Sequence, residues 1–220
     1  SVAFENMERF FPQKKIILTG NPVRSSLIKS KLEVAKNKKN SLLSKFSLNI
    51  LVLGGSLGSE KLNEIISNNI FFFKKNKIKV IWQCGKNYYE RYKAFENKFV
   101  KIFPFLEQID RFYNECDIVI SRAGALTISE LCIVGKPSIL VPSPNVSENH
   151  QFYNAKYLVD RKAAIMIEEK KINIEFLMHL QKLLESKEIR RQLSKAIYKL
   201  AKPNATKEIV LQINNILSNG

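Results

Sequence analysis

The segment from Asp117 to Gln151 contains the residues of this chain that are best spaced for binding an anion. The β-branched run Asp117–Ser121 predicts a buried parallel strand, which ends at the small-residue turn Arg122-Ala123-Gly124. A helical pattern begins directly afterwards, near Ala125. Unpaired backbone N–H groups and the positive end of the helix dipole meet at such a helix start. The segment therefore predicts a site for a phosphate or a similar anionic group.

Thr127 and Glu130, in the first turns of that helix, support two interpretations. Their T-x-x-E spacing is that of a capping box, in which both side chains only close the helix N-terminus. Alternatively, Glu130 accepts hydrogen bonds from ligand hydroxyl groups, and one carboxylate can accept from two of them. An acid beside an anion is unfavourable unless it points at a neutral part of the ligand. The position of the carboxylate must therefore decide between the two.

A second small-residue turn, LVLGGSLGS, follows another strand-like run. Gly54, Gly55 and Gly58 permit positive φ angles and a close approach of the backbone to phosphates. Ser56 adds a hydroxyl group that can donate to a phosphate oxygen. The turn is not a P-loop, because it lacks the GK[ST] ending, and it is not a GxGxxG fingerprint. The alternative is a tight strand–helix turn in which Ser59 caps the following helix.

Two further strings place polar side chains at predicted helix starts. TGNPVR follows the predicted strand Lys15–Thr19 and ends in Arg24, a planar and permanent cation that suits a phosphate. Its alternative is an exposed arginine in the first helical turn. SENHQFYNA carries His150 and Gln151, and a single histidine at such a place is more often a surface residue than a catalyst.

Strand-like runs and helical patterns alternate along the chain. The predicted strands are 15–19, 49–53, 79–83, 100–103, 117–121, 138–141 and 164–167. The predicted helices are 24–36, 60–73, 88–96, 109–115, 126–133, 150–160, 174–184, 188–200 and 205–217. Such alternation predicts an α/β fold, a Rossmann-like parallel sheet with helices on both faces. Ligands of these sheets bind beyond the carboxyl ends of the strands, which is where the turns above fall.

Composition excludes several classes of protein. Apolar residues make up 45% of the chain, which is enough for a core, and no apolar run reaches the length of a spanning helix. The net charge of +16 comes mostly from scattered lysines without a nucleic-acid-binding motif, so we expect attraction to an anionic membrane surface and no nucleic-acid partner. The run Phe71-Phe72-Phe73 either packs on the sheet or enters a membrane interface. Cys84, Cys116 and Cys132 are odd in number and far apart, and we expect reduced core thiols.

Four of these strings occur in an order that resembles the donor-binding half of the bacterial cell-wall glycosyltransferases of family 28. The resemblance implies the C-terminal half of a GT-B fold and a nucleotide-sugar site. It implies that Arg24 and Ser56 contact the donor, that Glu130 holds the ribose diol and that Gln151 binds the sugar hydroxyls. The backbone at Leu106 would read the uracil edge. The diphosphate and sugar would lie against the first residues of the helix, which are Ala125, Leu126, Thr127, Ile128 and Ser129. Leu57 departs from the family, in which glutamine is common.

The resemblance also implies an activity and its partners. Family members transfer N-acetylglucosamine from UDP-N-acetylglucosamine to undecaprenyl-linked muramyl-pentapeptide, peripherally on the cytoplasmic face of the inner membrane, and neither a metal nor a cofactor is implied. We expect residues 1–14 to be the end of an N-terminal acceptor domain that also supplies the catalytic residues. Residues 15–202 would form the donor domain, and 203–220 a helix that packs back toward the N-terminal domain. The alternative is a non-catalytic donor-binding subunit of a split transferase.

Overall fold

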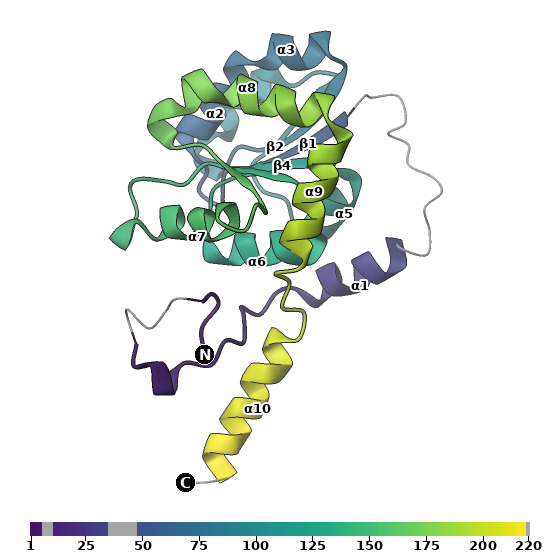
Figure 1. Ribbon diagram of the computed structural model, residues 1–220. Coiled ribbons are helices and arrows are strands. Elements are labelled where there is room, and N and C mark those ends of the chain that lie inside the picture. Colours follow the sequence, from purple (N-terminus) through teal and green to yellow (C-terminus); the bar gives the residue numbers. More distant parts are fainter. Residues whose placement is uncertain (6–10, 35–47, 219–220) are drawn as a thin grey trace.

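A parallel sheet of six strands organises the structure (Figure 1). The computed structural model describes residues 1–5, 11–34 and 48–218. The strands are β1 (Leu48–Leu53), β2 (Ile78–Gln83), β3 (Val100–Phe103), β4 (Ile118–Ser121), β5 (Ser138–Leu140) and β6 (Ile165–Met166). They lie in the order β3-β2-β1-β4-β5-β6, and every neighbouring pair is parallel. The predicted fold class is confirmed.

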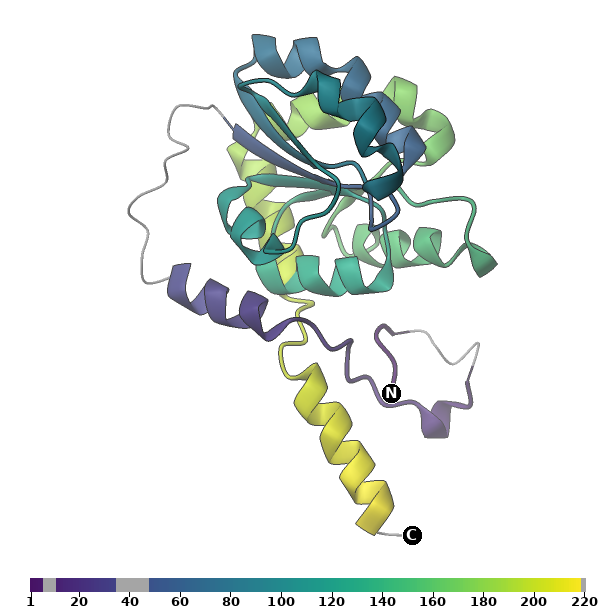
Figure 2. The same ribbon diagram turned by 180° about the vertical axis from the view of Figure 1, so that it is seen from behind.

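Helices cover both faces of the sheet. They are α1 (Ser25–Val34), α2 (Glu60–Asn68), α3 (Ile70–Lys75), α4 (Tyr89–Tyr92), α5 (Ile109–Glu115), α6 (Ala125–Val134), α7 (His150–Val159), α8 (Ile172–Glu185), α9 (Lys187–Tyr198) and α10 (Ala205–Ser218). Short 3₁₀ turns are η1 (Gln13–Lys15), η2 (Lys86–Tyr88), η3 (Lys93–Phe95), η4 (Ser147–Asn149) and η5 (Glu169–Lys171). Helices α2, α3 and α8 cover one face, and α5 and α6 cover the other (Figures 1 and 2).

The alternation of side chains along β1 explains why the sheet has two cores. Ile50 and Val52 point into the core beneath α2 and α8, whereas Leu51 and Leu53 point into the core beneath α5 and α6. Successive side chains of a strand face opposite sides, so a central strand covered on both faces must be apolar throughout. All four residues are buried accordingly.

Three of the predicted elements differ from the structure. The run predicted as a strand at 15–19 is not part of the sheet: among the described residues, only Leu18 pairs, in an isolated bridge with Val2. The predicted helix 60–73 is divided at Asn69, whose side-chain amide donates to the Ile65 carbonyl at 2.7 Å and ends α2 there. The predicted helix 88–96 is reduced to the single turn α4 between two 3₁₀ turns.

The strand order places the predicted site at one position of the sheet. Strands β2 and β3 follow on one side of β1, and β4, β5 and β6 follow on the other. The order therefore reverses between β1 and β4, whose last residues Leu53 and Ser121 are in register. This reversal opens a crevice at the carboxyl ends of the two strands. The glycine-rich turn follows β1, and the turn before α6 follows β4, so both border this crevice.

Helix α10 projects away from the body of the molecule in both views (Figures 1 and 2). Within it only Ala205 is buried, while Val210, Leu211, Ile213, Ile216 and Leu217 are exposed. The segment that leads into α10 crosses the segment that leads into α1: a Cβ atom built on Gly20 would lie 2.5 Å from the Cβ of Lys202. Among the described residues, no helix is long and apolar enough to span a bilayer.

Candidate nucleotide-sugar site

The start of α6 leaves backbone donors without partners. Its N-cap is Gly124, which has no side chain to close the helix, and the first turn carries no acidic residue. Ile128 donates to the Gly124 carbonyl at 3.0 Å and is the first residue to bond within the helix. The N–H groups of Ala125, Leu126 and Thr127 make no hydrogen bond to any described residue. Three free N–H groups and the positive helix end form a binding place for an anion.

The capping-box interpretation of Thr127 and Glu130 is wrong. Thr127 is already the third residue of α6, and Glu130 is the sixth, so neither stands at a position that could cap the helix. The two residues have the T-x-x-E spacing of a capping box, but the helix begins at Ala125, two residues before Thr127. A role in ligand binding is thus the interpretation of Glu130 that the helix boundary leaves open.

Glu130 is an almost fully buried carboxylate held between two partners. Its Oε2 accepts a hydrogen bond from the Tyr113 hydroxyl at 3.4 Å, and its Oε1 lies 3.3 Å from Nε of Arg24. The Arg24 contact has the distance of an ion pair without the geometry of a hydrogen bond, so buried Oε1 keeps an unfilled acceptor position. Burial raises the pKa of Glu130, and the charge of Arg24 and the Tyr113 hydroxyl oppose that rise. The site therefore presents one unsatisfied carboxylate oxygen.

The TGNPVR segment lies along α6. Besides the contact of Arg24 with Glu130, the Asn21 amide donates to the Ser129 hydroxyl at 3.1 Å. Ser129 in turn donates to the Ala125 carbonyl at 2.9 Å. The Ile128 side chain is fully buried in the core, and its N–H is engaged with Gly124. The structure therefore uses the Ser129 hydroxyl to hold the entering segment and uses Ile128 for packing, whereas Arg24 remains half exposed beside the helix start.

The glycine-rich turn combines an exposed part with a packed part. Gly55 has a φ of +89° with open space around it, and the neighbouring Ser56 is exposed. Gly58 has a φ of +91° and packs against Gly85, where a Cβ atom on Gly58 would lie 2.3 Å from the Cys84 carbonyl oxygen. Ser59 caps α2 by accepting from the Leu62 N–H at 3.3 Å, as its alternative interpretation predicted. The exposed half, Gly55 and Ser56, remains available to a phosphate.

Gln83 is a site residue that sequence analysis missed. This buried amide at the end of β2 donates to the Gly55 carbonyl at 2.9 Å and accepts from the Leu106 N–H at 3.2 Å. It thus joins the glycine-rich turn to the loop predicted to read uracil. The Leu106 side chain is buried and its N–H is occupied, so the predicted backbone contact would fall to its carbonyl or to its neighbours. The sequence did carry a signal for this residue, because a glutamine ends the largely apolar strand run IKVIWQ.

Gln151 and Asn154 fix the turn before α6 from the side of α7. The Gln151 side-chain oxygen accepts from the N–H groups of Ala123 at 3.2 Å and Ser143 at 2.9 Å. The Asn154 amide donates to the Ala123 carbonyl at 3.1 Å. These bonds occupy the oxygen of Gln151, whereas its amide nitrogen makes no hydrogen bond to a described residue. That nitrogen is the group through which Gln151 could meet a sugar hydroxyl.

His150 and Arg122 have supporting positions. The exposed His150 ring contacts the Ser147 carbonyl through Nδ1 at 2.9 Å. Arg122 donates to the Val141 carbonyl at 3.1 Å and pairs with Glu169, so it links the ends of β4 and β5. Arg122 therefore braces the loops around the crevice.

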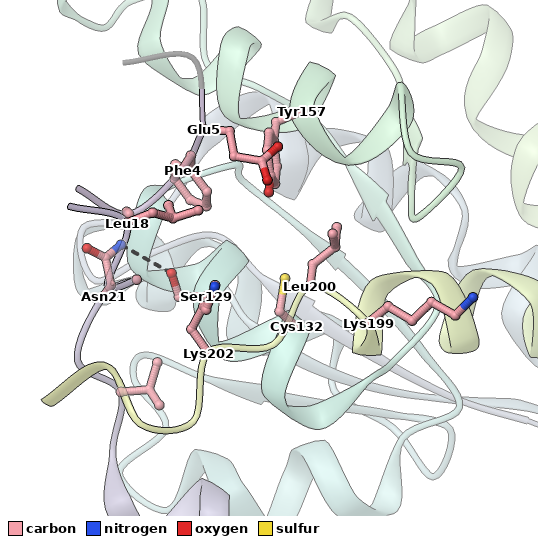
Figure 3. A pocket seen from close by; sticks show the side chains of 13 residues that line it. Phe4, Glu5, Leu18, Asn21, Ser129, Cys132, Tyr157, Lys199, Leu200 and Lys202 are labelled. Atoms are coloured by element: carbon pink, nitrogen blue, oxygen red, sulfur yellow. Dashed lines mark hydrogen bonds between the residues drawn. The ribbon is translucent and has the colours of Figure 1, made fainter. Parts of the chain in front are cut away.

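A cavity of about 140 Å³ lies beside α6 (Figure 3). Ser129 and Cys132 of α6, Tyr157 of α7, and parts of the entering and leaving segments line it. Figure 3 shows the Asn21–Ser129 hydrogen bond at its wall. The cavity shares Ser129 with the predicted donor site, and Arg24 and Glu130 are not among its lining residues.

The cysteines are core thiols, as predicted. Cys84, Cys116 and Cys132 are buried and unpaired. Burial raises the pKa of Cys84 to about 11 and the pKa values of Cys116 and Cys132 to about 12, so all three are protonated at neutral pH. Within the described residues, no cluster of three histidine, cysteine or acidic side chains could hold a metal ion.

Replacing Gly124 tests ligand binding at the start of α6 without a large change in the stability of the fold. Its φ of −64° suits any residue, and an added Cβ would meet only Thr127 Oγ1, at 3.7 Å. The fold itself thus gives no reason for a glycine here, whereas a bound phosphate would. We expect Gly124→Ala to weaken UDP binding about tenfold and to change the free energy of unfolding by less than about 1 kcal/mol. Calorimetric titration and urea unfolding measure both, and unchanged UDP affinity would show that no ligand approaches this position.

Comparisons with known proteins identify the family of this domain. The sequence profile of the glycosyltransferase family 28 C-terminal domain matches residues 49–209. The UDP-N-acetylglucosamine–N-acetylmuramyl-(pentapeptide) pyrophosphoryl-undecaprenol N-acetylglucosamine transferase of Flavobacterium psychrophilum is 46% identical over 218 residues, which are 96% of this chain and 58% of that protein. Its counterpart in Cytophaga hutchinsonii is 41% identical over 99% of this chain and 59% of its own length. The chain thus spans less than two thirds of these relatives.

Solved structures show the same fold. The crystal structure of Acinetobacter baumannii MurG superposes with a TM-score of 0.72 at 28% identity, over 93% of this chain and 58% of that one. A Neisseria meningitidis UDP-GlcNAc 2-epimerase bound to UDP-GlcNAc superposes with a TM-score of 0.61 at 18% identity, over 95% of this chain and 57% of that one. The second likeness concerns the fold alone.

Proposed function

Since the chain belongs to glycosyltransferase family 28, over that family's C-terminal domain, we propose that it is the donor-binding part of an N-acetylglucosamine transferase. The donor would be UDP-N-acetylglucosamine, and the acceptor the lipid-linked muramyl-pentapeptide named for its relatives. One observation carries the proposal: the unsatisfied Glu130 oxygen and the three free N–H groups of α6 lie on the same helix. Together they fit a nucleotide that carries hydroxyl groups at one end and a diphosphate at the other.

We assign a part of the donor to each group. The diphosphate lies between the start of α6 and the exposed part of the glycine-rich turn, with Arg24 adding a positive charge. The ribose diol donates to Oε1 of Glu130. The uracil lies against the loop at Leu106, which Gln83 ties to the glycine-rich turn. The amide nitrogen of Gln151 faces the sugar hydroxyls.

These groups favour departure of UDP. In the proposed inverting transfer, the acceptor oxygen forms a bond to the anomeric carbon as the bond from that carbon to the UDP oxygen breaks. The acceptor proton passes to a base, which we place in the portion of the relatives that this chain does not span. Negative charge then grows on the diphosphate, where the helix N-terminus and Arg24 are already positioned to stabilise it.

The same portion of the relatives is our proposed partner for α10. Five apolar side chains of that helix are half exposed or more: Val210, Leu211, Ile213, Ile216 and Leu217. Packing of α10 against the rest of a two-domain enzyme would bury them. The net charge of +16 supports a peripheral place at the anionic cytoplasmic face of the inner membrane, where the lipid-linked acceptor lies.

Calorimetric titration of the chain with nucleotide sugars tests the proposal. We expect UDP-N-acetylglucosamine to bind at least tenfold more tightly than GDP-mannose, because the loop at Leu106 would read the uracil edge, whereas the ribose is common to both donors. Competition by UDP alone would show that the nucleotide supplies most of the affinity. Equal binding of the two sugars would contradict the proposed donor.

A further inference from the structure

Tyr113 is a fully buried tyrosine of α5 whose hydroxyl group reaches Glu130 from the core. It lies in the core between the sheet and α6, in a cluster that includes Leu106 and Ile128. Its hydroxyl donates to Oε2 of Glu130 at 3.4 Å. A buried hydroxyl that lacks a partner destabilises a fold, so this contact satisfies a requirement of the core.

The hydroxyl makes the two oxygens of Glu130 different. Oε2 is occupied by Tyr113, whereas Oε1 lies beside Arg24 and has no hydrogen bond. The Arg24 side chain is half exposed, whereas the Tyr113 side chain is fully buried. Tyr113 is fixed by packing on all sides. Of the two partners, Tyr113 is therefore the one that can hold the carboxylate in a constant orientation.

We propose that Tyr113 is a positioning residue for donor binding, which fixes Glu130 so that its open oxygen meets the ribose diol. The inference rests on the proposed function, because it assigns a role toward that same ribose. Tyr113 itself touches no part of the donor and acts only through Glu130.

Tyr113 also keeps Glu130 in the state that accepts hydrogen bonds. Burial raises the pKa of Glu130, and Arg24 and Tyr113 oppose the rise. Burial, together with the Glu130 charge, raises the pKa of Tyr113 well above its ordinary value, so Tyr113 remains a donor. The neighbouring thiol of Cys116, which follows α5, adds to that rise. Among the described side chains of α7 and α9, no charged group acts on Glu130.

Tyr113→Phe tests the inference, because it removes one oxygen atom and keeps the ring. At pH 7 we expect UDP to bind about threefold to tenfold more weakly, with a reduced preference for UDP over 2′-deoxy-UDP. UDP affinity should fall at low pH as Glu130 becomes protonated, and we call this part of the pH profile the acid limb. In Tyr113→Phe we expect the acid limb to move to higher pH, because Glu130 loses the hydrogen bond from Tyr113 that lowers its pKa. Tyr92→Phe is the matched control, since that hydroxyl is buried in the opposite core and has no hydrogen-bond partner. It should leave the affinity and its pH profile unchanged.

A double-mutant cycle with Glu130→Gln separates positioning from general packing. In a chain that already carries Glu130→Gln, Tyr113→Phe should change the preference for ribose over deoxyribose by less than about twofold. Site-specific 3-fluorotyrosine in place of Tyr113 is a second variant that keeps the packing and donates more strongly, and it should move the acid limb to lower pH. If wild type binds UDP, and Tyr113→Phe and the fluorinated chain behave like wild type, this inference alone is overturned. If wild type fails to bind UDP, the proposed function falls and the inference falls with it.

Discussion

Replacing Glu130 with glutamine is expected to weaken UDP binding by roughly ten- to a hundredfold. The variant keeps the size of the side chain but loses a charge-assisted acceptor for the ribose diol, which is worth about 1.5–3 kcal/mol. The preference for UDP over 2′-deoxy-UDP should fall as well, because that preference reports contact with the 2′-hydroxyl. Calorimetric titration of both chains with both nucleotides measures the two effects.

The stability of the same variant should move in the other direction. Burial raises the pKa of Glu130 in the folded chain, so this group favours folding most at low pH. That contribution is lost as the pH rises through the raised pKa. A glutamine cannot ionise, and we expect Glu130→Gln to unfold at the same or a higher urea concentration than wild type at pH 7. An unchanged nucleotide preference together with a large loss of stability would mark Glu130 as a structural residue instead.

Replacing Gly58 with alanine should destabilise the fold by about 3 kcal/mol, because two costs add at this position. The φ of +91° lies where side chains other than glycine are disfavoured by about 1–2 kcal/mol. The new Cβ would also lie 2.3 Å from the Cys84 carbonyl oxygen, and relieving such an overlap costs about 1–3 kcal/mol. A shift of the midpoint in urea unfolding at constant slope measures the sum.

Gly55→Ala is the matched control for this prediction. Gly55 has nearly the same φ, +89°, but no atom lies within 4 Å of the position of its Cβ. It should cost only about 1 kcal/mol, which is the backbone contribution alone. If the two alanine variants proved equally stable, the contact between Gly58 and the β2 loop would not contribute to folding.

The sequence predicted the sheet because each strand carries its own signal. A run such as LNILVL is apolar throughout its buried part, and a strand covered on both faces has that pattern. The same signal failed at 15–19, an apolar run whose one bridge within the described part of the chain is with Val2. A local pattern shows that a segment can be extended, but it does not show which partner lies beside it. Asn69 is the opposite case, since one side-chain hydrogen bond ends a helix whose apolar pattern continues.

The candidate site divides in a similar way. Motifs placed Glu130 and the glycine-rich turn beyond the carboxyl ends of sheet strands, where the structure has them. Arg24 was expected after a strand at 15–19 that is not part of the sheet, and it lies at the site through its contact with Glu130. The residues that hold them, Gln83 and Tyr113, were not found. Each acts through a contact with a residue that is 17 to 28 positions away, which no spacing rule describes.

The crossing of the entering and leaving segments at Gly20 and Lys202 bears on how the outer parts of the molecule can turn. If the entering and leaving segments joined the domain at separate points, the outer parts could rotate only about the line between those points. Because the two segments instead meet at one point, rotation is possible about any axis through that point. Residues 11–18 and α10 lie beyond this point (Figure 1), so they share one centre of rotation relative to the sheet.

Residues 1–5 limit that freedom. Phe4 stacks against Tyr157 with ring centroids 5.3 Å apart, and Glu5 pairs with Arg161, so this short segment is fastened to α7 and the turn after it. The Asn21–Ser129 hydrogen bond adds a second fastening, next to Glu130 on α6. Rotation of residues 11–18 about the crossing must therefore strain or break the contacts that residues 1–5 make with α7 and the turn after it, because Val2 is bridged to Leu18.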